Sequence, residues 1–436
     1  MTERLLQFIW QFQYFNASHL CSKDDEPIRI IHPGLCNTNQ GPDFSNARIM
    51  IGSATWIGSV ELHIKASDWE KHRHSFDRNY QNVVLHVVWE DDTPPGKNPG
   101  NQQSALPLVE LKTRVSKLLL QRYEELMLSP AFIPCGNNTG NVSDLTWRGW
   151  KDRLLIERLL RKAAQVEALL KRNNFHWEET FWWMLARNFG MTVNAEAFEA
   201  IARSVPLSVL GRHKNQIHQL EALLLGQAGM LARQFEEDYP NLLKREYRFM
   251  KKKYGLKPVA MPLYSLRMRP SNFPAVRLAQ LAMLVHQSSH LFSRLKDAPS
   301  AATLRTYFEV TANDYWHYHY RFDHVSAYRE KTTGEIFIDS VIINTVAPVL
   351  FAYGHYHHDD HFKERAVESL EQTRAEKNKL IGGFEKLGVS NKNARESQAL
   401  IELKNEYCDH HRCLECAIGN TFLRSGIASA GKSFSQ

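Results

Sequence analysis

The sequence predicts an α+β fold in which a small α/β domain precedes a larger helical domain. Short β-branched or alternating segments alternate with turn residues before residue 116, whereas apolar residues recur at helical spacing from Val142 onward. With 436 residues, of which 43% are hydrophobic, the chain is long enough for two or three domains. We expect an α/β domain over 1–130, a helical domain over 131–425 and a disordered tail over 426–436.

The α/β domain is predicted to begin with a helix, because Leu5, Leu6, Ile9 and Trp10 lie at helical spacing after a possible cap at Thr2. Turn residues then separate segments with β propensity, and the element order is helix, three strands, helix, strand, with one more strand beyond. The predicted elements are a helix over 3–15, strands over 27–34, 44–51 and 57–65, a helical segment over 67–81, and strands over 82–90 and 105–115.

The remainder is predicted to be all-helical up to about residue 425, with breaks near 205, 257–274 and 327–335. One apolar stripe shows the pattern clearly: Leu155, Leu159, Val166, Leu169 and Leu170.

Composition narrows the classes of protein that the chain can belong to. No apolar run approaches the roughly 18 residues that span a bilayer. The N-terminus lacks a basic region followed by a cleavage site, so we expect no secretory signal and a cytoplasmic location. Six cysteines are too few for a disulfide scaffold, and a net charge of +7 permits a polyanionic partner.

Acidic and basic side chains gather on one predicted hairpin. Alternation along the strand places Glu61, His63 and Lys65 on one face, and a turn at Gly52 sets Asp43 opposite Glu61. Two carboxylates so placed can share a divalent cation. The alternative is that Asp43 caps a turn and Glu61 lies on a solvated face.

The element order, together with Pro42-Asp43 and Glu61-Leu62-His63, resembles the PD-(D/E)xK nuclease core, which has a restriction-endonuclease-like fold. The resemblance implies Mg²⁺ held by Asp43, Glu61 and the carbonyl of Leu62, with Glu3 of the first helix assisting. The family has Lys where this chain has His63, and the nearest lysine is Lys65. This departure affects catalysis more than metal binding.

Histidines form a second group around the same hairpin. His-x-His spacing beside a carboxylate is typical of Zn²⁺ ligands, and His63, His72, His74 and Asp77 supply it. The alternative is a set of imidazoles that hydrogen-bond across a small domain. His86, inside an apolar strand, is interpreted as a hydrogen-bonded core residue.

The cysteines form a third group. Cys408, Cys413 and Cys416 lie at short loop spacing, and Cys135 can supply a fourth thiolate for Zn²⁺ or a four-iron cluster. His410 or His411 could replace one thiolate. Free buried thiols are the alternative interpretation.

Cations interleaved with Tyr, Phe and Met occur in two stretches, residues 243–257 and 267–277. Such stretches suit the phosphate backbone of DNA or RNA, although a solvated helix face has the same composition. The predicted contacts are Lys251, Lys252, Lys253, Arg267 and Arg269.

Nearly the whole chain resembles a bacterial family, domain of unknown function 2851, through IWQFQYFN, GPDFSNARI, GSVELHIKASDWEKHRH, VVLHVVWEDD and CLECAIGN. The functional prediction is a divalent-metal-dependent nuclease, or a degenerate nuclease fold, that acts on DNA or RNA. Two alternatives stay open: a non-catalytic scaffold that binds nucleic acid or protein, and a zinc-dependent hydrolase of a small molecule.

Overall fold

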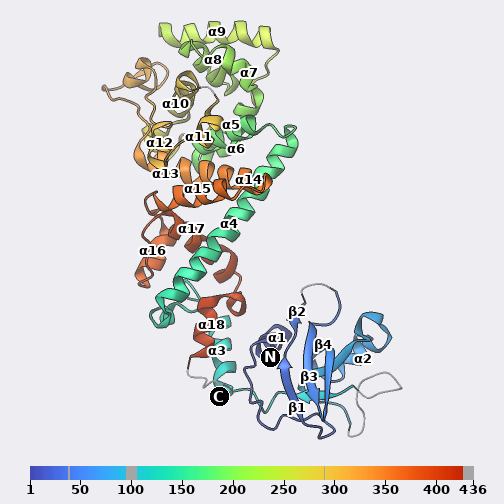
Figure 1. Ribbon diagram of the computed structural model, residues 1–436. Helices are drawn as coiled ribbons and strands as arrows, with labels where there is room; N and C mark the ends of the chain where they lie inside the picture. Colours follow the sequence, from blue (N-terminus) through green and yellow to red (C-terminus); the bar gives the residue numbers. More distant parts are fainter. Residues whose placement is uncertain (38–39, 95–105, 289, 426–436) are drawn as a thin grey trace. The chain divides into compact units, whose positions relative to one another are not determined.

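A computed structural model describes residues 1–37, 40–94, 106–288 and 290–425 (Figure 1). The chain forms two compact units: unit 1 is Met1–Trp150 with Leu403–Gln436, and unit 2 is Lys151–Glu402. This division differs from the predicted boundaries, because the C-terminal helix packs against elements near residues 117–141. The predicted tail, 426–436, lies outside the described residues.

Unit 1 combines a sheet with short helices from both ends of the chain. Its elements are α1 (Glu3–Gln11), β1 (Ile28–His32), β2 (Leu35–Cys36), β3 (Phe44–Ile51), β4 (Ala54–Lys65), α2 (Asp68–Lys71), η1 (His74–Phe76), η2 (Arg78–Tyr80), β5 (Val83–Glu90), β6 (Leu108–Glu110), α3 (Lys117–Leu128), η3 (Gly136–Asn141), η7 (Leu403–Cys408), η8 (Cys413–Glu415) and α18 (Ala417–Arg424).

The predicted order of helix, three strands, helix and strand is confirmed, with the two-residue strand β2 in addition. The sheet has the order β1-β3-β4-β5-β6, and β2 pairs with β3. β1, β3 and β4 are antiparallel, whereas β4, β5 and β6 are parallel to one another. The hairpin turns at Gly52, where φ is +59° and the flanking residues Ile51 and Ala54 pair.

Two predicted elements are shorter in the structure. The first helix ends at Gln11 and not at residue 15, because Gln13 has a left-handed backbone with φ 56°. The strand predicted over 105–115 covers only β6, because the N–H groups of Arg114 and Val115 turn back to the carbonyl of Leu111. Helix α3 was not among the predicted elements.

The core of unit 1 lies between α1 and the sheet. Leu6, Ile9 and Trp10 of α1 are fully buried, as are Phe44 and Val60 of the strands beneath. Each such side chain stabilises the fold by about 1.5–3 kcal/mol. This packing covers one face of β4, so the other face is left for Glu61 and His63.

Strand β4 bends just before its polar residues. The pairing with β5 shifts register between Ser59 and Val60, next to Gly58. A Cβ at Gly58 would lie 2.5 Å from the carbonyl oxygen of Asn82, so only glycine fits this close approach.

In its described residues, unit 2 is helical apart from one short hairpin of β7 and β8. The prediction of an all-helical region is therefore wrong at this hairpin. Its two strands are too short to show a two-residue period in the sequence. The helix α4 (Asp144–Arg172) begins in unit 1 and continues into unit 2. The other elements are α5 (Trp177–Phe189), α6 (Met191–Ser204), α7 (Leu207–Arg212), α8 (Ile217–Gln227), α9 (Asp238–Tyr254), η4 (Pro270–Asn272), α10 (Pro274–Gln287), α11 (Leu291–Asp297), α12 (Ala301–Thr306), η5 (Asp314–Tyr318), β7 (His319–Arg321), β8 (His324–Val325), α13 (Glu335–Val341), η6 (Ile342–Val346), α14 (Ala347–Tyr356), α15 (Asp360–Glu371), α16 (Lys379–Lys386) and α17 (Ala394–Glu402).

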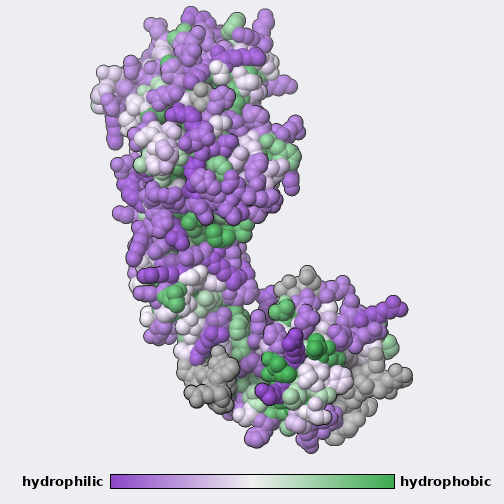
Figure 2. All heavy atoms as spheres, in the orientation of Figure 1, coloured by the Kyte–Doolittle hydropathy of each residue, from purple (hydrophilic) through white to green (hydrophobic). Residues whose placement is uncertain are grey.

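The expectation that no apolar run approaches membrane-spanning length is wrong for one helical stretch of the described residues, Glu335–Tyr356, which by length and composition is long and apolar enough to cross a membrane. Its most apolar window is 78% buried inside the protein, as is usual for a core helix of a soluble protein. Hydrophilic residues cover most of the surface in Figure 2, and apolar residues form separate patches on it.

Candidate metal centre

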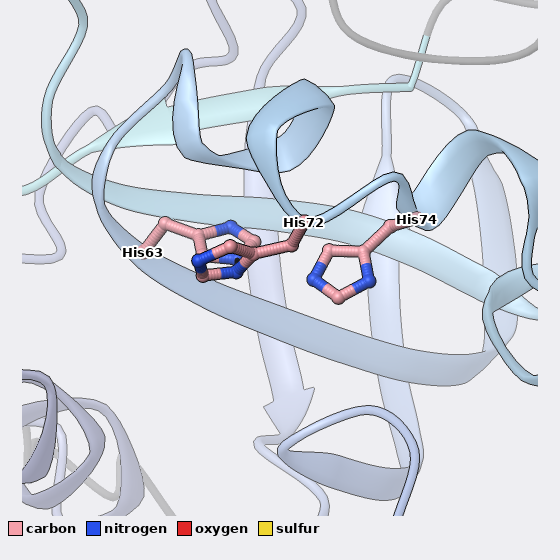
Figure 3. Close-up of side chains that lie close together, drawn as sticks. All are labelled: His63, His72 and His74. Atoms are coloured by element: carbon pink, nitrogen blue, oxygen red, sulfur yellow. Dashed lines mark hydrogen bonds between the residues drawn. The ribbon is translucent and has the colours of Figure 1, made fainter.

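Three imidazoles converge beside the centre of the sheet in unit 1 (Figure 3). His63 comes from β4, whereas His72 follows directly after α2 and His74 begins η1. Arg73 separates the latter two and has a left-handed backbone, with φ 58°, which reverses the chain so that both neighbours approach His63. One ligand nitrogen from each ring lies within 4.8 Å of the other two. The three rings can therefore hold one metal ion.

Glu61 adds a carboxylate to this group. Its Oε1 lies 3.6 Å from Nε2 of His63 and 3.6 Å from Nε2 of His74. Ligands around a tetrahedral ion with bonds of ~2.0–2.1 Å are separated by roughly 3.4 Å, so these atoms are close to coordinating distance. Glu61 is 6% exposed, and the interpretation of a solvated face is wrong for this residue.

Neighbouring groups hold these ligands in place. His63 Nδ1 hydrogen-bonds His86 Nε2 at 2.8 Å, and His63 Nε2 lies 3.2 Å from His72 Nδ1. The backbone N–H of Asp43 donates to Glu61 Oε2 at 3.0 Å. Partners of this kind fix the orientation of metal ligands and raise their basicity.

Asp43 lies behind Glu61, with both carboxylate oxygens already bonded to the protein. The side chain of Gln7 donates to Oδ1 at 2.8 Å, and the N–H of Leu62 donates to Oδ2 at 3.0 Å. Asp43 and Glu61 are neighbours as predicted. In this arrangement, however, Glu61 faces the imidazoles and Asp43 supports the backbone around it.

Burial shifts the pKa values of these side chains toward their neutral forms. The pKa of Glu61 rises to about 8, through burial and then through the charge of Asp43, whose own pKa rises to about 6 through burial. Burial lowers the pKa values of His63 and His86 to about 3. His63 and His86 are therefore neutral near pH 7, and the neutral form of His63 is the one that binds metals.

The centre is open on one side. His72 is exposed and His74 half-buried, and a cleft of about 750 Å³ is lined by His74, Asp77 and Tyr80. The ring of Tyr80 stacks on His74 with centroids 3.8 Å apart. A metal held by all four side chains would accept water or substrate as a fifth ligand, from the side of this cleft.

The other predicted residues of this site lie around its edge. Glu3 is exposed on α1, close enough for its charge to raise the pKa values of Asp43 and Glu61. Lys65 is exposed near Asp92, whose pKa it lowers. Asp77 caps η2 by accepting the N–H of Asn79 at 2.9 Å.

Gln7 and Tyr80 were missed in the sequence. Gln7 has a faint signal, since it lies one helical turn after Glu3 and so shares its face of α1. Tyr80 has no signal, because only the tertiary fold brings it to His74.

The four predicted cysteines lie together in unit 1, all buried. Every pair among Cys135, Cys408, Cys413 and Cys416 is close enough for one thiolate to raise the pKa of another. Burial is the main reason that the pKa values of Cys135 and Cys413 rise to about 12. Among the described residues, no three of these sulfurs lie within 4.8 Å of one another.

The predicted nucleic-acid contacts lie in unit 2 on two different kinds of segment. Lys251, Lys252 and Lys253 are exposed in the last turn of α9. Arg267 and Arg269 are exposed in the irregular segment before α10, so the second basic stretch is helical only from Pro274. This agrees with the break predicted over 257–274, and Pro270 and Pro274 account for it, because proline disfavours a helical residue before it.

Comparison with known proteins gives one match. No curated protein and no solved structure matches the chain. The sequence model of one family matches residues 3–379, which includes the candidate metal centre but ends before Cys408 and CLECAIGN. Because this match covers well over half of the chain, the chain belongs to the family described as Protein of unknown function (DUF2851).

Proposed function

We propose that the protein is a metal-dependent hydrolase of phosphodiester bonds in DNA or RNA, with its metal held by His63, His72, His74 and Glu61. The observation that carries this proposal is the convergence of the three imidazoles, with Oε1 of Glu61 3.6 Å from two of them. Three nitrogens and one oxygen favour Zn²⁺ or a similar transition metal over Mg²⁺, which prefers oxygen ligands.

The element order supports a nuclease core. An antiparallel hairpin leads into a parallel pair of strands, with α1 packed against β4, and Asp43 and Glu61 lie next to each other at its centre. We propose on this basis that unit 1 has a restriction-endonuclease-like fold in which His63 has replaced the lysine and changed the preferred metal. The overall positive charge of the chain suits a phosphodiester substrate.

The residues of the site have separate tasks in this proposal. When bound, the metal lowers the pKa of a coordinated water and offsets charge on the scissile phosphate. His63 is oriented by His86, and Glu61 by the N–H of Asp43. The exposed position of His72 leaves room for the phosphate to approach.

A second candidate, a zinc-dependent hydrolase of a small molecule, is favoured by the cleft beside His74. Its volume of about 750 Å³ is in the range of small-molecule sites. A nuclease would need an open path for a strand, whereas a small-molecule enzyme would enclose its substrate in this cleft.

The test compares metal content and cleavage in matched variants. We expect wild-type protein loaded with Zn²⁺ or Mn²⁺ to cleave labelled single- or double-stranded DNA or RNA. His72→Ala and His74→Ala should lose at least 100-fold in rate and bind metal more weakly. His324→Ala, which removes an exposed imidazole of β8, should behave like wild type.

Two results would separate the candidates. Tight metal binding without cleavage of any nucleic acid would exclude the nuclease and leave the small-molecule hydrolase or the scaffold. A wild-type protein that binds neither Zn²⁺ nor Mn²⁺ would exclude the metal centre itself.

A further inference from the structure

A large cleft in unit 2 has a strong excess of positive charge. It has a volume of about 1400 Å³ and is lined by residues of α4, α5, α6, α10 and α13, among others. Three carboxylates reach its wall, and one of these, Glu199, pairs with Arg187 at 2.9 Å. Six further cations line the cleft: Lys162, Arg269, Arg277, Arg329, Lys331 and Lys377. In the described residues, none of these six forms an ion pair with a carboxylate.

Arg277 is the most informative of these cations, because it is 6% exposed and faces no acid. Its two terminal nitrogens donate to Gln280 at 2.9 Å and to Asn272 at 2.6 Å, and the guanidinium lies over Phe337 at 3.9 Å. Its Nε has no hydrogen-bond partner in the described part of the chain. Since an unpaired buried charge is costly, an arginine held in this way indicates an anion that completes the site.

Lys331 repeats this pattern on the same wall. It is 3% exposed, and its ammonium group donates to the carbonyls of His317 and Arg329 at 3.2 and 2.9 Å. These partners are neutral, and the ammonium group also lies 4.0 Å from the centre of the Tyr320 ring, so Lys331 has favourable contacts but no carboxylate to balance its charge. Two buried cations without acids on one cleft wall are difficult to explain as structural residues.

Polar groups beside the cations are also left incomplete. The Oδ1 of Asn188 is buried without a partner in the described residues. Asn344 accepts a hydrogen bond from Lys162 at 3.2 Å and belongs to the π-helical turn η6. Such turns cost helix stability and occur frequently at functional sites.

We propose that this cleft binds the phosphate groups of a nucleotide or of a nucleic-acid strand. Phosphate is the anion that best fits arginine and lysine donors combined with amide side chains. The volume is large enough for several linked phosphates with their sugars. All the residues involved lie in unit 2, so the proposal does not depend on the metal centre or on its hydrolytic activity.

The test measures binding of three probes to the full chain: pyrophosphate, ATP and a labelled single-stranded oligonucleotide. Arg269→Ala combined with Arg329→Ala removes two exposed cations of the cleft without disturbing its buried wall. We expect at least a tenfold loss of affinity for whichever probe binds. For an oligonucleotide, the slope of log affinity against log salt should fall by about 1.4, since each single-strand phosphate contact contributes about 0.7.

Matched controls identify the site. Lys171→Ala combined with Lys386→Ala also removes two exposed cations of unit 2, but neither lines the cleft, and affinity should stay within twofold of wild type. Binding by His72→Ala should be unchanged, even if that variant has lost all metal. The probe that binds most tightly identifies whether the cleft recognises the phosphates of a nucleotide or those of a nucleic-acid strand. The proposal is overturned if no probe binds at 50 mM salt, or if the cleft and control variants lose affinity equally.

Discussion

Glu61 is a carboxyl group that the fold keeps in its neutral form when no metal is present. Its pKa of about 8 in the folded protein exceeds its ordinary value of 4.5, because the side chain is buried beside Asp43. Between these two pH values the folded protein retains a proton that the unfolded chain has released. Its contribution to stability is therefore complete below about pH 4.5 and is lost as the pH rises to about 8.

This linkage gives a prediction for the metal-free protein. With a chelator present, the melting temperature should fall as the pH is raised from 7 to 8, above the range in which His63 and His86 take up protons in the unfolded chain, and Glu61→Gln should reduce that fall because glutamine does not ionise. Thermal unfolding of the wild type and of the variant across the pH series measures the two declines in melting temperature. An equal decline in the variant would show that another group titrates in this range.

Bound metal should have the opposite pH dependence. Coordination by Glu61 displaces its proton, so metal affinity should rise between pH 6 and 8. The stabilisation given by a fixed Zn²⁺ concentration should then be larger at pH 8 than at pH 6. A stabilisation that is equal at both values would place the metal on groups that are already deprotonated.

His86 positions a ligand without being one itself. It is fully buried and bonds His63 at 2.8 Å. His86→Phe should weaken metal affinity by about 10–100-fold, the usual effect of removing such a partner. His86→Gln can still offer a hydrogen-bonding group and should recover part of the loss. If both variants bind metal like wild type, His86 is only a packing residue.

At the scale of elements, the C-terminal segment packs beside the region around residue 135, and the four buried cysteines lie where these two segments meet. Burial raises the pKa of Cys416, and the N–H groups of Gly419 and Ile418 and the side chain of Trp150 offset part of this rise. Donors aimed at a sulfur favour its thiolate form, which is the form that binds metal. Gly419 is fixed by close approach, because a Cβ there would lie 2.5 Å from the carbonyl oxygen of Cys413.

The spacing of these sulfurs gives the next prediction. One zinc ion with bonds of ~2.3 Å would hold them less than ~4 Å apart, whereas a four-iron cluster binds each sulfur through a different iron and so holds the sulfurs farther apart. Since no three of the described sulfurs lie within 4.8 Å, we expect iron and inorganic sulfide in protein purified without oxygen. Cys413→Ser should lose them and melt at a lower temperature, while Cys36→Ser, an exposed thiol, should retain both. Zinc at one ion per chain would contradict the cluster.

At the scale of the whole molecule, local patterns predicted the order of elements well but not the way in which sites assemble. The hairpin at Gly52 and the buried strand β5 follow from turn residues and β-branched runs. The left-handed backbone at Arg73, which brings His72 and His74 to His63, has no signature in the sequence. The cleft around Arg277 was not predicted as a site, although Arg269 on its wall was a predicted phosphate contact, because its other walls come from helices far apart in the chain. The histidine group, which comes from one contiguous segment, was therefore accessible to sequence reasoning, and so was the cysteine group, because four cysteines suggest a shared metal even when they are far apart in the chain. A cleft lined by common residue types from many helices was not accessible.

The insertion of unit 2 into unit 1 leads to the last prediction. Unit 1 is made from both ends of the chain and unit 2 from its middle, and each has its own core. We expect two thermal transitions in the full chain.

Zn²⁺ at about 1,000 times its dissociation constant should stabilise unit 1 by roughly 4 kcal/mol. This corresponds to a rise on the order of 10 °C in the melting temperature of one transition only. ATP or an oligonucleotide, if bound in the cleft of unit 2, should raise the other. His72→Ala should abolish the first shift and Arg269→Ala with Arg329→Ala the second, and calorimetry measures both in the same sample. A single transition that moves as a whole with either ligand would mean that the two units unfold as one.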